Sequence, residues 1–119
     1  MPQGLDEWVE GYRLAWENAD AEGAAALFTP DATYRSNIFE EAHQGRAGIE
    51  DYWRNVTATQ GEVRVRMGRP FADGHRVAVE WWTTMDVAGE AVTLPGCLLL
   101  EFDDDWLCRS LREYWQFAD

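Results

Sequence analysis

A change in hydrophobic period near residue 58 constrains the fold of this chain more than any other feature of its sequence. Before this point, apolar residues recur at steps of three and four, which places them on one face of an α-helix. After it they alternate with polar residues, which is typical of β-strands with one buried face. Helices followed by strands predict an α+β domain whose sheet buries one face against the helices.

The N-terminal half contains two clear helical stripes, over residues 5–19 and 49–56. Asp20 offers an N-cap for a short helix over residues 21–28. Thr29-Pro30-Asp31 should end that helix, and a short strand is expected over residues 32–37, followed by a loop.

Four longer strands are predicted over residues 62–70, 76–87, 91–102 and 106–117. Short turn signals separate them, so the strands should form an antiparallel meander. Pro95-Gly96 should bend or bulge the third of these strands. We expect a single domain over residues 1–119, in which a curved antiparallel sheet wraps around the N-terminal helices as a cone.

The net charge of the chain limits the classes of molecule that it is expected to bind. The formal net charge is −12 at pH 7 and the pI is about 4.4, which argues against binding to nucleic acids or to anionic membranes. The sequence shows neither a signal peptide nor a long apolar span, so a cytoplasmic protein is expected. Cys97 and Cys108 lie on neighbouring strands but out of register, which predicts free thiols. No metal-ligand cluster or cofactor motif is present in the sequence.

One carboxylate lies on the apolar face of the last predicted strand. With a period of two, Glu113 shares that face with Arg109, Leu111, Trp115 and Phe117. A carboxylate held away from water there would have a raised pKa. Two interpretations stay open: a cavity carboxylate that acts as a base or as a ligand acceptor, or a buried ion pair with an arginine such as Arg109.

Aromatic side chains are numerous enough to fill a core and still line a cavity, with seven Trp, four Tyr and five Phe. Their hydroxyl and indole groups need hydrogen-bond partners, which a ligand or ordered water would supply. The candidates are Tyr12, Trp16, Tyr34, Tyr52, Trp53 and Trp115.

The order of elements and several local motifs resemble the nuclear transport factor 2-like superfamily, in its SnoaL-like and ketosteroid isomerase-like branch. The resemblance covers essentially the whole chain and implies a cystatin-like cone, but no particular reaction. Its carriers are Tyr12 and Trp16, Asp20-Ala21-Glu22-Gly23, Leu27-Phe28-Thr29-Pro30-Asp31-Ala32-Thr33-Tyr34, Gly45-Arg46-Ala47-Gly48-Ile49 with Tyr52-Trp53, and Arg112-Glu113-Tyr114-Trp115.

Only some of the catalytic positions of these enzymes are matched by the same residue types in this chain. Tyr12 matches the oxyanion donor of ketosteroid isomerases, but Ser36 stands at the position of their base and Cys97 near that of their second Asp. A serine hydroxyl is a poor base without a partner that activates it.

Limonene epoxide hydrolases resemble the chain elsewhere. Tyr34, Ser36 and Glu113 take the positions that hold their attacking water, but their Arg-x-Asp pair falls near Trp81-x-Thr83 and is missing. The cavity histidines of scytalone dehydratases are missing as well, because His43 and His75 fall in a loop and beside a turn.

We therefore predict a protein with a cavity for a small, largely apolar molecule that carries a hydroxyl or carbonyl group. If it is an enzyme, its chemistry is cofactor-independent acid–base catalysis by Glu113, with Tyr34 or Tyr12 as hydrogen-bond donor. The expected ligand-lining residues are Trp16, Ser36, Tyr52, Trp53, Cys97 and Trp115.

The competing hypothesis is a non-catalytic association module whose cavity is filled by tryptophans. Trp82 is expected on the convex side of the sheet, where an exposed indole needs cover, so a homodimer through that face is also predicted.

Overall fold

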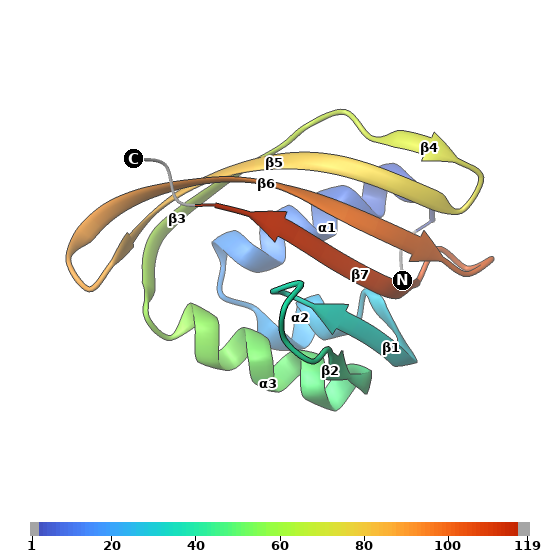
Figure 1. The fold of residues 1–119 in the computed structure, drawn as a ribbon, viewed down its shortest axis with the longest axis horizontal. Helices are drawn as coiled ribbons and strands as arrows, with labels where there is room; N and C mark the ends of the chain where they lie inside the picture. Colours follow the sequence, from blue (N-terminus) through green and yellow to red (C-terminus); the bar gives the residue numbers. More distant parts are fainter. Residues whose placement is uncertain (1–2, 117–119) are drawn as a thin grey trace.

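The long strands of the molecule arch over its helices (Figure 1). This computed structural model describes residues 3–116. The helices are α1 (Leu5–Glu17), α2 (Ala21–Ala25) and α3 (Gly45–Thr57), and the strands are β1 (Phe28–Arg35), β2 (His43–Gln44), β3 (Gln60–Met67), β4 (Phe71–Asp73), β5 (Arg76–Val87), β6 (Glu90–Phe102) and β7 (Cys108–Trp115). The predicted α+β class is confirmed.

Helix α2 is shorter than predicted, although its start is as expected. The Asp20 carboxylate accepts a hydrogen bond from the Gly23 N–H at 2.9 Å, which confirms the N-cap. The chain already enters β1 at Phe28, inside the segment expected to be helical. The pairing of β1 with β7 shifts register between Phe28 and Thr33. Pro30, which has no N–H to donate, therefore lies where the ladder is interrupted.

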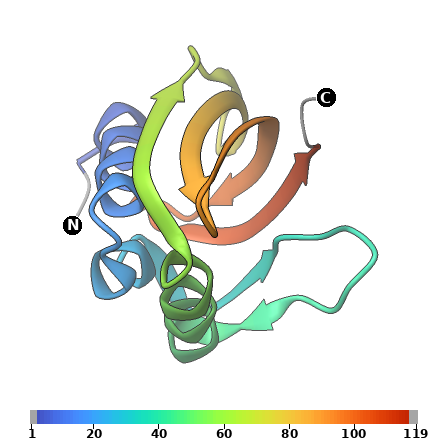
Figure 2. The ribbon, with the colours of Figure 1, turned by 90° about the vertical axis from the view of Figure 1, so that its left-hand side faces the viewer.

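The sheet has the order β2-β1-β7-β6-β5-β3, with β4 attached to β5. The pairs β3–β5, β5–β6 and β6–β7 are antiparallel, as the meander predicts. Strand β1 instead joins β7 in parallel, so the sheet is mixed. Seen from its end, the sheet curls into an open cone (Figure 2).

The expected bulge at Pro95-Gly96 does not occur. Trp81 pairs with Gly96 and Trp82 with Pro95 in an unbroken β5–β6 ladder. A Cβ atom on Gly96 would lie 2.3 Å from the Trp81 ring. The glycine is therefore needed because the indole packs directly over the backbone of β6.

An irregularity lies instead in the pairing of β6 with β7, between Glu101 and Phe102. It changes the alternation at the start of β7, so that Cys108 is buried and Arg109 is exposed, in contrast to the predicted face. Leu111 and Glu113 do face the interior, as predicted. Phe117, which was assigned to the same face, lies outside the described residues.

Aromatic side chains dominate the core between α1 and the sheet. Trp8, Tyr12 and Trp81 are each at most 1% exposed. Burial of such a side chain contributes about 1.5–3 kcal/mol. Both cysteines are free, as predicted. Among residues 3–116, none of the helices has the length and apolar character needed to cross a bilayer.

Candidate functional site

A cavity of about 700 Å³ opens on the inner side of the curved sheet. This volume lies in the range of ordinary small-molecule sites. The interior is thus not filled by tryptophans. The cavity is lined by Trp16, Ser36, Asn37, Glu40, Tyr52, Val56, Thr59, Gln60, Trp81, Met85, Val87, Ala88, Glu90, Val92, Leu94, Glu113 and Trp115.

A recess of about 30 Å³ continues this cavity inward. Trp16, Tyr52, Val56, Gln60 and Glu113 line both spaces, and the recess adds Tyr12, Tyr34 and Trp53. A space of this size holds about one water molecule. Only the wide cavity has room for a molecule of several atoms, and the recess has room for a single small group.

Glu113 on β7 lies where the cavity and the recess meet. The residue is 6% exposed and pairs across the sheet with Leu98. Among residues 3–116 no arginine forms an ion pair with it, and Arg109 is exposed, so the ion-pair interpretation is not supported. Burial raises the pKa of Glu113 to about 8. At neutral pH its carboxyl group is therefore mainly protonated.

Tyr12 from α1 and Tyr34 from β1 meet in the recess. Their hydroxyl oxygens are 3.1 Å apart and share a hydrogen bond. Burial, together with the nearby Glu113, raises the pKa of both hydroxyl groups well above the ordinary value. Both groups thus stay neutral, but their position in the recess keeps them away from the bulk of a ligand.

Tyr52 from α3 reaches the wide cavity as well as the recess. Burial raises the pKa of its hydroxyl, and a hydrogen bond with the side chain of Ser36 partly offsets this increase. The Tyr52 ring packs against His43 with ring centroids 4.5 Å apart. His43 was expected in a loop, but it begins β2, and its ring packs against that of Tyr52.

Tryptophans form much of the remaining wall. The Trp115 indole Nε1–H donates to the backbone oxygen of Ser36 at 2.8 Å and so connects the end of β7 to the end of β1. The Trp16 Nε1–H donates to Gln60 Oε1 at 3.0 Å. Trp53 contributes to the recess only.

Cys97 is the one predicted site residue that the fold directs elsewhere. It pairs with Glu80 on β5 and Tyr114 on β7, both of which are exposed. The neighbouring Leu98 is fully buried, so alternation along β6 turns Cys97 to the convex face. Its prediction as a ligand-lining residue is therefore wrong.

Several cavity residues were not predicted. Trp81 and Met85 belong to the apolar face of β5, and their period-two spacing was a usable signal. Gln60 carried no such signal, because its position depends on how the chain turns from α3 into β3. Glu40 and Glu90 are exposed residues that line the cavity, and they were missed because exposed acidic residues are common in this chain.

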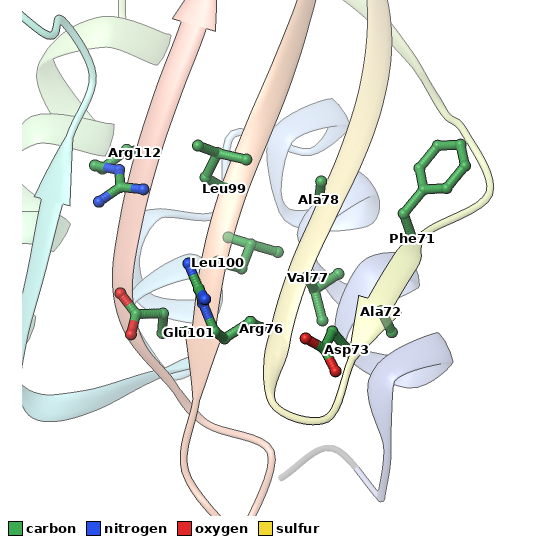
Figure 3. A pocket seen from close by; sticks show the side chains of 10 residues that line it. All are labelled: Phe71, Ala72, Asp73, Arg76, Val77, Ala78, Leu99, Leu100, Glu101 and Arg112. Atoms are coloured by element: carbon green, nitrogen blue, oxygen red, sulfur yellow. The ribbon is translucent and has the colours of Figure 1, made fainter.

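A second depression, of about 310 Å³, lies on the outer face of the sheet (Figure 3). Phe71 stands at one side of it and Arg112 at the other, with Ala78 and Leu99 between them. None of the predicted catalytic residues lines this depression, so it is not the candidate active site.

Comparison with known proteins gives four informative matches, two by sequence and two by structure. The model of the SnoaL-like domain family matches residues 9–109. A steroid delta-isomerase from Nocardioides simplex is 26% identical over 111 residues, which cover 93% of this chain and 89% of the relative.

Two solved structures share the fold. A hypothetical protein with a ketosteroid isomerase-like fold from Catenulispora acidiphila, in complex with trimethylamine, superposes with a TM-score of 0.83 at 21% identity, over 93% of this chain and 86% of that one. SalBIII, an epoxide hydrolase/cyclase-like enzyme of pyran ring formation in salinomycin, gives a TM-score of 0.80 at 23% identity, over 93% and 89%.

Proposed function

The chain belongs to the SnoaL-like domain family, within the nuclear transport factor 2-like superfamily, and from this premise we propose that it moves a proton on a small, largely apolar molecule that carries a carbonyl or hydroxyl group. One observation carries the proposal: Glu113 is a buried carboxyl without an ion-pair partner among residues 3–116, at the inner end of an open cavity. Perturbed carboxyl groups in clefts are typical of acid–base sites.

A single carboxyl group favours reactions that return the proton they remove. In an isomerisation, the carboxylate of Glu113 takes a proton from the carbon beside a carbonyl group and returns it to another carbon. In a ring closure, the carboxylic acid protonates the oxygen of the C–O bond that breaks, a hydroxyl group of the same molecule attacks the carbon, and the hydroxyl proton returns to the Glu113 carboxylate. Both leave Glu113 unchanged. Epoxide hydrolysis by a separate base and acid is less suitable, because Trp81 and Thr83 stand where the second pair of groups would lie.

Tyr52 is the best-placed hydrogen-bond donor for the negative charge that develops on the ligand oxygen. Tyr52 and Ser36 share a hydrogen bond and both line the wide cavity, whereas Tyr12 and Tyr34 line only the recess. Loss of one such donor typically reduces kcat by about 10²–10³-fold. The role expected for Tyr12 or Tyr34 thus passes to Tyr52, and the first two support the recess.

A β,γ-unsaturated ketone is the first substrate to test, because the N. simplex relative is a steroid delta-isomerase. Migration of the double bond into conjugation is followed by ultraviolet absorbance. We expect turnover that is lost in Glu113→Gln and retained in Glu80→Gln, whose side chain is exposed on β5. Turnover that survives in Glu113→Gln contradicts the proposal. The open cavity does not support the alternative of an association module with a filled interior.

A further inference from the structure

The cavity wall carries acidic groups without basic ones. Glu40, Glu90 and Glu113 line it, whereas no arginine, lysine or histidine does so among residues 3–116. Glu40 and Glu90 are exposed and Glu113 is buried, so acidic groups extend from the rim of the cavity toward its inner end. A wall of one sign attracts ligands of the opposite sign and repels those of its own. Anionic ligands are therefore disfavoured.

Within the described part of the chain, residues 3–116, the ionised form of Glu113 has no counter-charge. Among these residues, the groups around Glu113 from neighbouring elements are uncharged as long as the tyrosine hydroxyls stay protonated. These groups are Tyr12 and Trp16 of α1, Tyr34 of β1, Tyr52 and Trp53 of α3, Gln60 of β3 and Leu98 of β6. A buried carboxylate is costly unless it is paired. A positive charge beside Glu113 would therefore have to arrive with the ligand.

Aromatic rings supply the remainder of a cation site. Trp16, Tyr52, Trp81 and Trp115 all line the cavity. The rings of Trp16 and Trp81 are 5.0 Å apart at an interplanar angle of 72°, so the two indoles form a corner. Aromatic faces attract ammonium groups, by about 0.5–2 kcal/mol per contact. The same walls accept the apolar part of a ligand.

We propose that the cavity selects an apolar amine, bound as its ammonium ion between Glu113 and the tryptophan corner. This inference rests on the proposed function, because it assigns the ligand to the same cavity. The bound ammonium ion also provides the ionised carboxylate that the proposed function needs. The ammonium ion holds Glu113 as the carboxylate, and the carboxylate is the form that can take a proton from another part of the molecule.

Three probes of similar size test the charge preference: N,N-dimethylcyclohexylamine, cyclohexyl methyl ketone and cyclohexanecarboxylate. Binding is measured by titration calorimetry at pH 7 in two buffers of different ionisation enthalpy, which gives the number of protons released. We expect the amine to bind at least tenfold more tightly than the ketone, with release of about one proton from Glu113. The carboxylate should show no binding.

Glu113→Gln should abolish both the proton release and the preference for the amine, whereas Glu80→Gln should retain both. Equal or tighter binding of the ketone by the wild type, or amine binding without proton release, overturns the inference. If the probe ketone does not bind more weakly than the amine while the β,γ-unsaturated ketone is still turned over in a Glu113-dependent reaction, the proposed function stands and this inference fails. If none of the three probes binds, the inference and the small-molecule function both fail.

Discussion

The hydroxyl oxygens of Tyr12 and Tyr34 lie 3.1 Å apart at the closed end of the cavity, where both residues are only 1% exposed. One of the two hydroxyls donates to the other, so this hydrogen bond forms without a ligand. Tyr52 differs, because it lines the wide cavity as well as the recess. The structure thus separates tyrosines that support the site from one that can contact a ligand.

Tyr34→Phe should reduce the free energy of unfolding by about 1–3 kcal/mol, because it leaves the buried Tyr12 hydroxyl without its partner. Tyr52→Phe should change stability less but weaken binding of a carbonyl ligand. Urea unfolding and ligand titration of the two variants check this difference. Equal effects of both substitutions on ligand binding would contradict the separation.

Glu113 should make the protein less stable as the pH rises. Its pKa is about 8 in the folded protein, above the ordinary value of 4.5. The folded state therefore holds the proton more tightly, so the stabilisation is complete below pH 4.5 and is lost as the pH rises through 8. The loss amounts to ~3 kcal/mol at pH 7. The difference in unfolding free energy between wild type and Glu113→Gln, measured from pH 4.5 to 8.5, isolates this contribution. A constant difference across that range would refute it.

Gly96→Ala should disturb the cavity wall. The new Cβ atom would lie 2.3 Å from the Trp81 ring, so the indole or the β6 backbone has to move. Overpacking of this kind costs about 1–3 kcal/mol. Gly4→Ala is the matched control, because a Cβ there meets no atom within 4 Å. Unfolding curves and tryptophan fluorescence check the outcome, and unchanged values for Gly96→Ala would show that Trp81 does not pack as described.

We also propose a homodimer through the convex face, as Trp82 suggested. Trp82 is half-buried there under the Arg66 guanidinium, 4.5 Å from its ring. On the same sheet, Phe71 is 71% exposed and lines the outer depression together with Leu99 (Figure 3). Light scattering should give a dimer for the wild type and a monomer for Leu99→Glu.

The control for the dimer is Leu14→Glu, which alters an exposed apolar residue on α1 and should stay dimeric. A monomeric wild type would exclude the homodimer.

Local sequence signals were sufficient for the helices and the long strands. The bounds of β5 match the prediction, because an uninterrupted alternation of period two runs along it. The parallel pairing of β1 with β7 was not predictable, because it joins segments far apart in the chain. The same holds for the exposed position of Arg109, which depends on an irregular pairing with β6.

The candidate site was predictable where alternation continues to the end of a strand. Glu113 and Trp115 follow that rule, and both reach the cavity. Cys97 was assigned to the site because its position resembles that of the second Asp of ketosteroid isomerases. Alternation along β6 turns its side chain to the convex face, outside the cavity. Gln60 lines the cavity, and His43 packs against Tyr52 without lining it. Both positions depend on the tertiary arrangement of α3 and β2, which leaves no periodic signal in the sequence.

The proposed chemistry depends most directly on the ionisation of one carboxyl group. Carbon-13 labelling of the glutamate side-chain carboxyl allows Glu113 to be titrated by NMR in the ligand-free protein, with Glu113→Gln used to assign its resonance. We predict that Glu113 titrates with a pKa of about 8, because burial without an ion-pair partner disfavours its charge. A resonance that titrates near 4.5 would contradict the central claim that Glu113 is a desolvated proton-handling group.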